Sequence, residues 1–342
     1  MQQKAKILLI YTGGTIGMIK DYRSGALKPF NFNKLIKNIP ELGQLDCVID
    51  SVSLDNPIDS SNMNTAHWAT LANIIGDRYL GYDGFVVLHG SDTMSYTASA
   101  LSYMLENLSK PVIFTGSQLP IGDLRTDAKE NLITSIQIAA LRENDEPVIQ
   151  EVGLYFEYKL YRGNRTTKIN AEHFQAFASP NYPALGESGV HLRINREYLM
   201  RKSRLKNFTV HTHMDRNVAI FKLFPGFARP LLKSILSIPG LRALILETYG
   251  AGNAPTDDWF LSDLREASAS GLHIVNATQC SGGSVQMGAY ETSEALGEMQ
   301  ILNGKDITTE AAITKLMYLL GSNVSANSFK TIFETSLRGE MK

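Results

Sequence analysis

Residues 6–17 read Lys-Ile-Leu-Leu-Ile-Tyr-Thr-Gly-Gly-Thr-Ile-Gly, an apolar run that passes directly into a glycine-rich turn. A short run without alternating polar side chains is typical of a strand that is covered on both faces, as in a parallel sheet. The glycines permit positive φ and a close approach by another backbone, and Thr15 follows them. The turn is either a tight turn with a capping threonine or a ligand-binding loop. A nucleotide-phosphate loop is disfavoured because neither G-x-x-x-x-G-K-[ST] nor G-x-G-x-x-G is present.

Short apolar runs of the same kind alternate with helical patterns along the rest of the chain. Strands are expected at 6–11, 85–89, 112–115, 152–158, 218–224, 243–248 and 274–278. Helices are expected at 65–79, 94–108, 126–142, 228–237, 259–270 and 309–320. This alternation predicts an α/β fold built from parallel βαβ units.

The length of 342 residues exceeds what one hydrophobic core usually serves, so two domains are expected. The segment 190–213 is rich in Arg, Lys and Asn and lacks a long apolar face. We interpret it as a linker between an N-terminal domain, 1–189, and a C-terminal domain, 214–342. The alternative is a charged surface insertion within one domain.

Composition excludes several functional classes. The formal net charge of −1 offers no basic excess for neutralising phosphates, so nucleic acid is not an expected partner. No run approaches the length of a membrane span, and the apolar run at 7–11 is too short for a signal peptide. We therefore expect a cytoplasmic protein that does not associate with membranes and whose two cysteines, Cys47 and Cys280, are reduced.

Five of the expected strands end in small, hydroxyl-rich or glycine-rich loops. The loops are 12–15, 90–93, 116–118, 249–253 and 279–283. Open parallel sheets bind ligands at the carboxyl ends of their strands, where the amino ends of the following helices also lie. The pattern favours a site for a small, partly anionic ligand.

Two further stretches carry candidate chemistry. In His89-Gly90-Ser91-Asp92-Thr93-Met94, a hydroxyl beside a carboxylate could orient water, or Ser91 or Asp92 could simply cap the next helix. His89 itself is interpreted as a packed residue at the strand end. The segment 162–168 is either a solvated charged loop or a site at which Lys168 is held beside a carboxylate.

The sequence gives little support for metal or serine-triad chemistry. Neither H-E-x-x-H nor Cys-x-x-Cys occurs, and no G-x-S-x-G elbow is present. No metal and no cofactor are expected.

Together these motifs resemble those of the bacterial type I, cytoplasmic L-asparaginases. The resemblance rests on TGGTIG at 12–17, on HG-hydroxyl-DTM at 89–94 and on Asp59-Ser60-Ser61-Asn62-Met63 between them. Further matches lie at 82–89, 162–168, 249–255 and 276–280, so the resemblance extends over nearly the whole chain. It implies a larger N-terminal α/β domain, a smaller Rossmann-like C-terminal α/β domain, and a homotetramer of intimate dimers.

The resemblance also implies roles for individual residues in the hydrolysis of L-asparagine. Thr15 corresponds to the nucleophile, and Ser91, Asp92 and Lys168 to the group that activates water. The residues expected to hold the α-amino and α-carboxyl groups of the substrate are Asp59, Ser60, Ser61, Ser91 and Asp92. Asn253 matches a residue that reaches the site of a neighbouring subunit.

The chain departs from the family pattern at three places. Ser91 replaces a threonine and keeps the hydroxyl. Ala26, after Gly25, stands where a catalytic-site tyrosine is common, and Tyr22 is a candidate substitute. Some members have a second, regulatory asparagine site, which Thr167 and Cys280 match. Its usual arginine is Glu247 here, and a carboxylate cannot pair with the carboxylate of an effector. Weak or absent allosteric activation is expected.

Two rival functions remain at this stage. One is a glutaminase or an amidotransferase subunit that uses the same chemistry on another amide. Glutamine is longer than asparagine by one methylene, and a pocket discriminates against one methylene by only about 1–3 kcal/mol. The other is an amino-acid sensor that binds without turnover, for which Thr15 and Lys168 would not both be needed.

Overall fold

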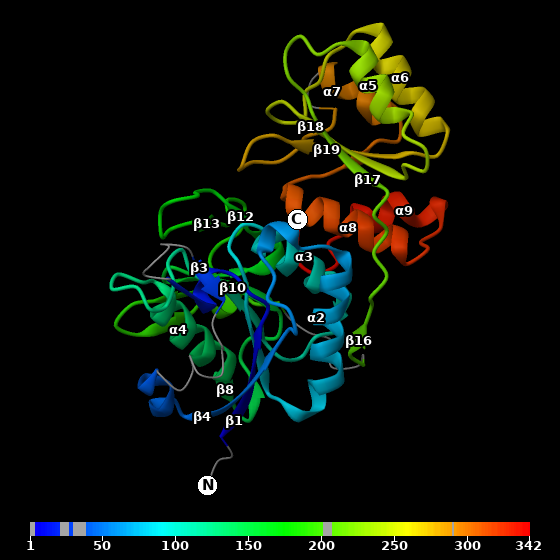
Figure 1. Cartoon of the computed structure of the whole chain (residues 1–342). Helices are drawn as coiled ribbons and strands as arrows, with labels where there is room; N and C mark the ends of the chain where they lie inside the picture. The colour runs from blue at the N-terminus through cyan, green and yellow to red at the C-terminus, as the bar shows by residue number, and fades with distance from the viewer. Residues whose placement is uncertain (1–3, 21–26, 30–38, 201–206, 289–290) are drawn as a thin grey trace. The chain divides into compact units, whose positions relative to one another are not determined.

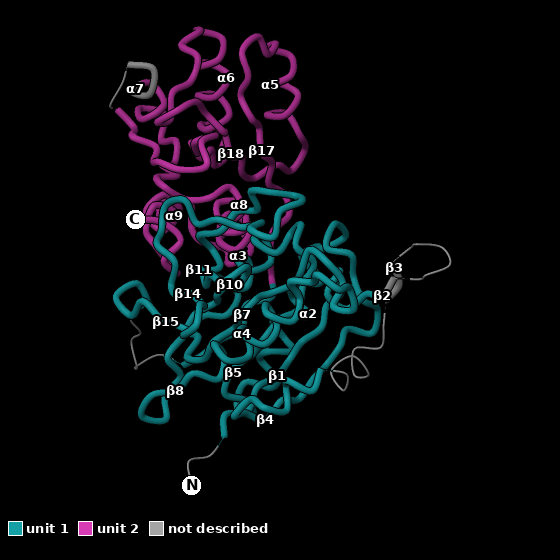
Figure 2. Tube along the Cα trace, turned by 90° about the vertical axis from the view of Figure 1, so that its left-hand side faces the viewer, with its two compact units in different colours: residues 1–212 teal, residues 213–342 magenta. Residues whose placement is uncertain are grey.

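The computed structural model describes residues 4–20, 27–29, 39–200, 207–288 and 291–342. The chain forms two compact units, residues 1–212 and 213–342 (Figure 2). The first part of the predicted linker 190–213 takes part in the sheet of unit 1, because β15 (Leu192–Ile194) is one of its edge strands. Residues 201–206 of this segment lie outside the described residues.

Unit 1 is organised by an eight-stranded sheet in the order β15-β14-β11-β10-β7-β5-β1-β4 (Figure 1). The remaining strands are β14 (Gly186–Ser188), β11 (Lys159–Arg162), β10 (Val152–Phe156), β7 (Val112–Thr115), β5 (Gly84–Leu88), β1 (Ala5–Tyr11) and β4 (Cys47–Ser53). The strands from β10 to β4 pair in parallel, and β11, β14 and β15 extend the sheet antiparallel. β5, β7 and β10 are buried along their whole length, as their apolar sequences predict.

Helices cover both faces of this sheet. α2 (Thr65–Arg78) and α3 (Met94–Met104) lie on one side and α4 (Ala128–Ala140) on the other (Figure 1). One hydrophobic core forms on the α4 side, where Leu132 and Ile136 pack against alternate residues of the strands, including Leu9, Val86 and Ile113. This alternation follows from the two-residue repeat of a strand.

Short strand pairs complete unit 1. They are β2 (Met18–Lys20) with β3 (Leu27–Pro29), β6 (Leu105–Glu106) with β16 (Thr209–Val210), β8 (Arg142–Glu143) with β9 (Glu146–Pro147), and β12 (Thr167–Lys168) with β13 (Phe177–Ala178). The helix predicted over 94–108 ends at Met104 because the next two residues pair with β16, and Asn107 then adopts a φ of 56°. The sequence prediction for the end of this helix was wrong.

Unit 2 holds a separate parallel sheet in the order β17-β18-β19-β20. Its strands are β17 (Val218–Lys222), β18 (Ala243–Thr248), β19 (His273–Thr278) and β20 (Leu302–Asn303). Its helices are α5 (Arg229–Leu236), α6 (Asp258–Ala269), α7 (Glu291–Glu298), α8 (Thr309–Gly321) and α9 (Ala326–Phe333). The predicted class, an α/β protein with two parallel-sheet domains, is confirmed.

A buried ion pair closes the C-terminal end of unit 2. Lys315, on α8, and Glu340 have no solvent-exposed side-chain surface, and the Lys315 Nζ donates to Glu340 Oε1 at 2.5 Å. The same ammonium donates to the carbonyl oxygens of Phe333 and Thr335 at 2.6 and 2.7 Å. The charge is therefore fully hydrogen-bonded, which is the condition for a buried ion. This cluster ties the last residues of the chain to α8.

We expect Glu340→Ala to lower the free energy of unfolding by about 3–5 kcal/mol, because it leaves the Lys315 ammonium buried without a counter-ion. Urea denaturation followed by circular dichroism measures this. The matched control is Glu298→Ala, at an exposed glutamate, which should change the free energy by less than about 0.5 kcal/mol. Equal transitions for the two variants would contradict the prediction.

The effect also depends on pH. Burial raises the pKa of the Glu340 carboxyl, but the Lys315 charge and the N–H groups of Leu337 and Arg338 outweigh burial and hold that pKa below its usual range. Because the pKa of Glu340 is lower in the folded than in the unfolded state, ionised Glu340 stabilises the fold. This stabilisation is complete above the unfolded-state pKa of glutamate, about 4.3. The stabilisation is lost as the pH falls through the folded-state pKa, so the difference between Glu340→Ala and the wild type should shrink in acid.

Candidate active site

Three loops of unit 1 touch at the carboxyl edge of the parallel sheet. They follow β1 and β5, which pair as Tyr11↔Leu88, and β4, which pairs with β1. A Cβ on Gly14 would lie 2.5 Å from the Gly90 nitrogen, and one on Gly13 would lie 2.2 Å from the Ile58 carbonyl oxygen. Both glycines also have positive φ, 129° at Gly13 and 84° at Gly14. Only glycine fits these positions, so its absence of a side chain is what lets the loops meet.

Thr15 is the first residue of a short 3-10 helix, Thr15–Gly17, directly after this contact. Its side chain is half-buried, and its hydroxyl makes no hydrogen bond to any residue in the described part of the chain. Thr12, by contrast, is buried and donates its hydroxyl to the Leu88 carbonyl at 2.9 Å. Of the two threonines in the turn, Thr12 has a structural hydrogen bond, and Thr15 has none to a described residue.

Ser91, Asp92 and Lys168 meet although about 77 residues separate them in sequence. The Lys168 Nζ, carried by β12, donates to Ser91 Oγ at 2.9 Å and to Asp92 Oδ1 at 2.6 Å. The Lys168 side chain is only 17% exposed, whereas the Asp92 side chain is 65% exposed. The lysine is therefore largely shielded from solvent, and the aspartate reaches it. The capping interpretation of Ser91 and Asp92 is wrong, because α3 begins after Thr93 without a side-chain cap.

Since Gly14 contacts Gly90, Thr15 and Ser91 are the next residues on two touching loops. This places the predicted nucleophile and the Ser91–Asp92–Lys168 cluster along the same edge of one sheet. The amide N–H groups of Gly90, Ser91 and Asp92 donate to no acceptor among the described residues. Unengaged N–H groups just before α3 form an anion-binding arrangement, to which the helix dipole contributes.

His89 packs at the end of β5, as predicted. It is fully buried, and burial lowers its pKa to about 4, so the ring is neutral near pH 7. A neutral ring whose Nδ1 lies 2.7 Å from the Gly90 carbonyl oxygen donates its hydrogen there, because a carbonyl only accepts. His89 therefore holds the backbone of the Ser91 loop.

The loop that contains Asp59, Ser60 and Ser61 packs against the same place. A Cβ on Gly90 would lie 2.6 Å from Ser60 Oγ, and Thr93 Oγ1 donates to the Ser60 carbonyl at 2.7 Å. The Asp59 carboxylate is exposed and accepts the N–H of Ser61 at 2.9 Å and its hydroxyl at 2.5 Å. These hydrogen bonds lower the pKa of Asp59, so it is anionic near neutral pH and can attract an ammonium group.

One residue of this edge was not singled out from the sequence. Gln118 follows β7 in the third strand-end loop, and its Oε1 accepts the Ser91 hydroxyl at 3.1 Å. The loop was recognised from its composition, but a glutamine beside two small residues gave no indication of a partner in another loop.

The remaining predicted residues fall on different parts of the chain. Thr167 belongs to unit 1, where β12 pairs with β13. Glu247, Asn253 and Cys280 belong to unit 2. Glu247 Oε1 accepts the Thr309 hydroxyl at 2.6 Å, Asn253 bridges back to Tyr249, and Cys280 is exposed. Tyr22, Gly25 and Ala26 lie outside the described residues.

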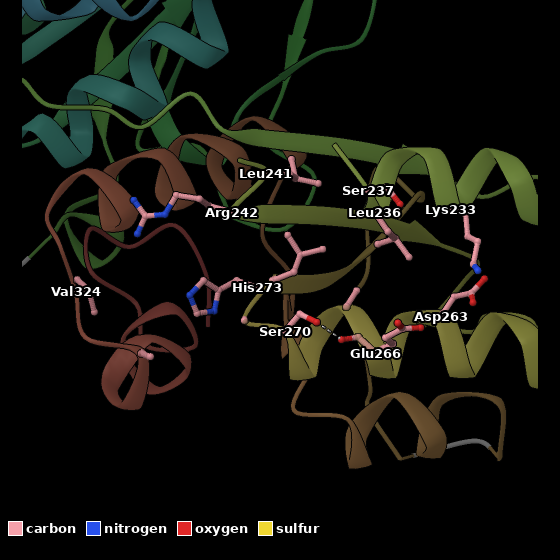
Figure 3. A pocket seen from close by; sticks show the side chains of 14 residues that line it. Lys233, Leu236, Ser237, Leu241, Arg242, Asp263, Glu266, Ser270, His273 and Val324 are labelled. Atoms are coloured by element: carbon pink, nitrogen blue, oxygen red, sulfur yellow. Dashed lines mark hydrogen bonds between the residues drawn. The ribbon is translucent and has the colours of Figure 1, made fainter. Parts of the chain in front are cut away.

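A pocket of about 570 Å³ in unit 2 contains none of these residues (Figure 3). Arg242 and His273 line it at the start of β18 and β19, opposite the end at which Glu247 and Cys280 lie. The described residues contain no group of three or more His, Cys, Asp or Glu side chains that could hold a metal ion. None of the helices in the described part of the chain has the length and apolar character of a membrane span.

Comparison with known proteins identifies the family. Residues 6–200 match the model of the N-terminal asparaginase domain, and residues 217–333 match the glutaminase/asparaginase C-terminal domain. The chain belongs to the asparaginase family. The two matches fall one in each unit, so the sheet edge described above lies within the N-terminal asparaginase domain.

Three relatives illustrate the range of this asparaginase family. The chain is 42% identical to L-asparaginase 1 of Escherichia coli K12, over 99% of this chain and 98% of that protein. It is 39% identical to the 60 kDa lysophospholipase of Mus musculus, over 100% of this chain and 63% of that protein. The crystal structure of L-asparaginase I from Vibrio cholerae superposes with a TM-score of 0.91 at 40% identity, covering 99% of this chain and 100% of that one.

Proposed function

We propose that this chain is an amidohydrolase that converts L-asparagine to L-aspartate and ammonia through an acyl-enzyme on Thr15. The observation that carries the proposal is the position of Thr15, whose hydroxyl bonds to no described residue, on a loop that touches the loop of Ser91, Asp92 and their partner Lys168. The 42% identity to an E. coli L-asparaginase supports asparagine as the substrate.

In the first half-reaction, Thr15 Oγ attacks the side-chain amide carbon and a Thr15 ester forms as the carbon–nitrogen bond breaks. The proton that the Thr15 hydroxyl loses is transferred to the leaving nitrogen, which departs as ammonia. The negative oxygen of the tetrahedral intermediate is stabilised by backbone N–H groups of residues 90–92, which have no acceptor among the described residues.

In the second half-reaction, water adds to the ester carbon, the bond to Thr15 Oγ breaks, and the hydroxyl regains its proton as aspartate leaves. Ser91, Asp92 and Lys168 hold and activate this water. The exposed carboxylates of Asp59 and Asp92 attract the α-amino group of the substrate. The Ser60 hydroxyl donates to its α-carboxylate, and the Ser61 hydroxyl does so once it turns away from the Asp59 carboxylate.

A coupled assay of ammonia release with asparagine and with glutamine tests the proposed function. We expect kcat/KM to be larger for asparagine than for glutamine, since relatives that are 42% and 40% identical to this chain are named L-asparaginases. A larger kcat/KM for glutamine would favour the glutaminase alternative, and binding of either amide without ammonia release would favour a sensor.

Regulation by a second asparagine molecule is expected to be weak or absent. Glu247 carries a negative charge where the resemblance requires an arginine, and its carboxylate already accepts the hydroxyl of Thr309 at 2.6 Å. The initial rate of ammonia release should therefore rise hyperbolically with asparagine concentration. A sigmoidal curve that becomes hyperbolic in Glu247→Gln or Thr167→Ala would contradict this prediction.

We further propose that the chain works in the cytoplasm as a homotetramer of intimate dimers, in which Asn253 approaches the site of a neighbouring subunit. The resemblance of the sequence motifs to those of the cytoplasmic L-asparaginases supports this proposal.

A further inference from the structure

Thr93 connects two loops of the sheet edge by a side-chain hydrogen bond. One is the carboxylate loop, residues 59–61, and the other is the amide loop, residues 90–92, which faces the reacting amide. The Thr93 Oγ1 donates to the Ser60 carbonyl oxygen at 2.7 Å, across 33 positions of sequence. We propose that Thr93 is a positioning residue that sets the length of amide the site accepts, and so its preference for asparagine over glutamine. This inference rests on the proposed amidohydrolase function.

The carboxylate loop is held from two sides. Just before it, the Ile58 N–H donates to the Thr12 carbonyl oxygen at 2.7 Å, which connects it to the loop after β1 through backbone atoms. Within it, the Ser60 carbonyl is held by the Thr93 hydroxyl. The hydrogen bond toward the amide loop is therefore made by a side chain, and a single substitution at Thr93 can remove it.

The Thr93 hydroxyl serves this contact and not the helix that it precedes. α3 begins at Met94, and Thr93 occupies the N-cap position without a side-chain hydrogen bond to the helix. A threonine at this position usually accepts a hydrogen bond from the first turn of its own helix. Here the hydroxyl donates to another loop, so it contributes to the arrangement of the site.

The separation of the two loops determines which amides fit between them. In the proposed reaction, the carboxylate loop holds the α-carboxylate while the side-chain amide lies at Thr15 beside the amide loop. Glutamine places one more methylene between these two groups than asparagine does. A pocket discriminates between ligands that differ by one methylene by about 10- to 200-fold. A hydrogen bond that fixes this separation therefore contributes to that discrimination.

Removing the Thr93 hydroxyl leaves the Ser60 carbonyl with a partner. The same oxygen accepts the Met63 N–H at 3.1 Å, which closes the 3-10 turn Ser60–Asn62. A carbonyl that keeps one hydrogen bond avoids the free-energy penalty of a polar group left without any partner. The carboxylate loop should then keep its own turn and lose its hydrogen bond toward the amide loop, so the separation loosens while the fold is retained.

Thr93→Val tests the proposal, because valine has nearly the same shape and lacks the hydroxyl. We expect the ratio of kcat/KM for asparagine to that for glutamine to fall about 5- to 20-fold, a part of the discrimination that one methylene allows. The change should come mainly from a higher KM for asparagine, since the groups around the reacting amide are kept. Thr93→Ser, which retains the hydroxyl, should keep the wild-type ratio.

Thr70→Val is the matched control. Thr70 lies on α2, is exposed, and donates its hydroxyl to the Ala66 carbonyl of its own helix at 3.0 Å. The same exchange at this position should leave the ratio and both KM values as in the wild type. Thr93→Ala removes the Thr93 hydroxyl without placing a methyl group against the Ser60 carbonyl, and it should lower the ratio as Thr93→Val does.

Hydrogen exchange distinguishes a loosened loop from a general loss of stability. In Thr93→Val the backbone amides of residues 61–63 should exchange about 2- to 10-fold faster, the range expected for the loss of one hydrogen bond. The midpoint of the urea transition should stay at that of Thr70→Val.

An asparagine-to-glutamine ratio that is unchanged in Thr93→Val and Thr93→Ala, or that falls equally in Thr93→Ser, would overturn the inference. A wild type that releases ammonia from both amides with equal kcat/KM would overturn it as well. Failure of the wild type to release ammonia from asparagine would instead overturn the proposed function.

Discussion

Thr15→Ala is expected to lower kcat for ammonia release from asparagine by roughly 10⁴-fold or more, because removing the nucleophile removes the acyl-enzyme route. The substrate should still bind, since the proposed contacts to its α-groups come from residues 59–61 and 91–92. The fold should be retained because the Thr15 hydroxyl hydrogen-bonds to no described residue. Ammonia release and the urea transition, measured on the same preparation, check both expectations.

Thr15→Ser is the matched control for this prediction. It keeps a hydroxyl at the same place and should restore most of the activity that alanine removes. Near-normal ammonia release by Thr15→Ala would show that another group attacks the amide, and Ser91 would become the first candidate.

Lys168→Met is expected to lower kcat by about 10²- to 10⁴-fold, the range typical of losing a group that transfers or stabilises a proton. Methionine has a similar length, but it leaves Ser91 and Asp92 without their shared donor. The free energy of unfolding should change little, because Asp92 is 65% exposed and remains hydrated. Steady-state kinetics across pH 5–10 measures the loss and the shape of the profile.

Lys168→Arg distinguishes charge from proton transfer. Arginine keeps the positive charge but stays protonated, and its planar group does not reproduce the geometry of an ammonium. If Lys168 transfers protons, arginine should rescue little of kcat. A Lys168→Met enzyme whose pH profile has the same shape as that of the wild type would argue against a role of Lys168 in activation.

Local sequence patterns predicted the frame of the site well. The loops at 12–15 and 90–93 were placed at one sheet edge because their strands are apolar throughout and parallel strands share a carboxyl edge. The edge strand β4 was missed because its sequence Cys-Val-Ile-Asp-Ser-Val-Ser alternates only in part and its residues are half-exposed. The end of α3 was misplaced because Leu105 and Leu108 continue the apolar helical pattern, and only pairing with β16 ends it.

Contacts between loops could not be derived in that way. The hydrogen bond from Lys168 to Ser91 spans 77 positions, and no periodicity links them, so it was expected only from the family resemblance. The contact between Gln118 and Ser91 likewise joins two separate loops, and two backbone carbonyls from a third segment orient the Gln118 amide. Such details depend on tertiary geometry and leave no mark in the local sequence.

The most direct test of the mechanism is to trap the acyl-enzyme. The wild-type enzyme is mixed with asparagine, quenched in acid within one turnover, and digested, and the peptides are analysed by mass spectrometry. The account predicts an aspartyl adduct on the peptide 7–20, with fragment ions that place it on Thr15 rather than Thr12. An adduct on Ser91, or rapid ammonia release with no adduct at any time, would contradict it.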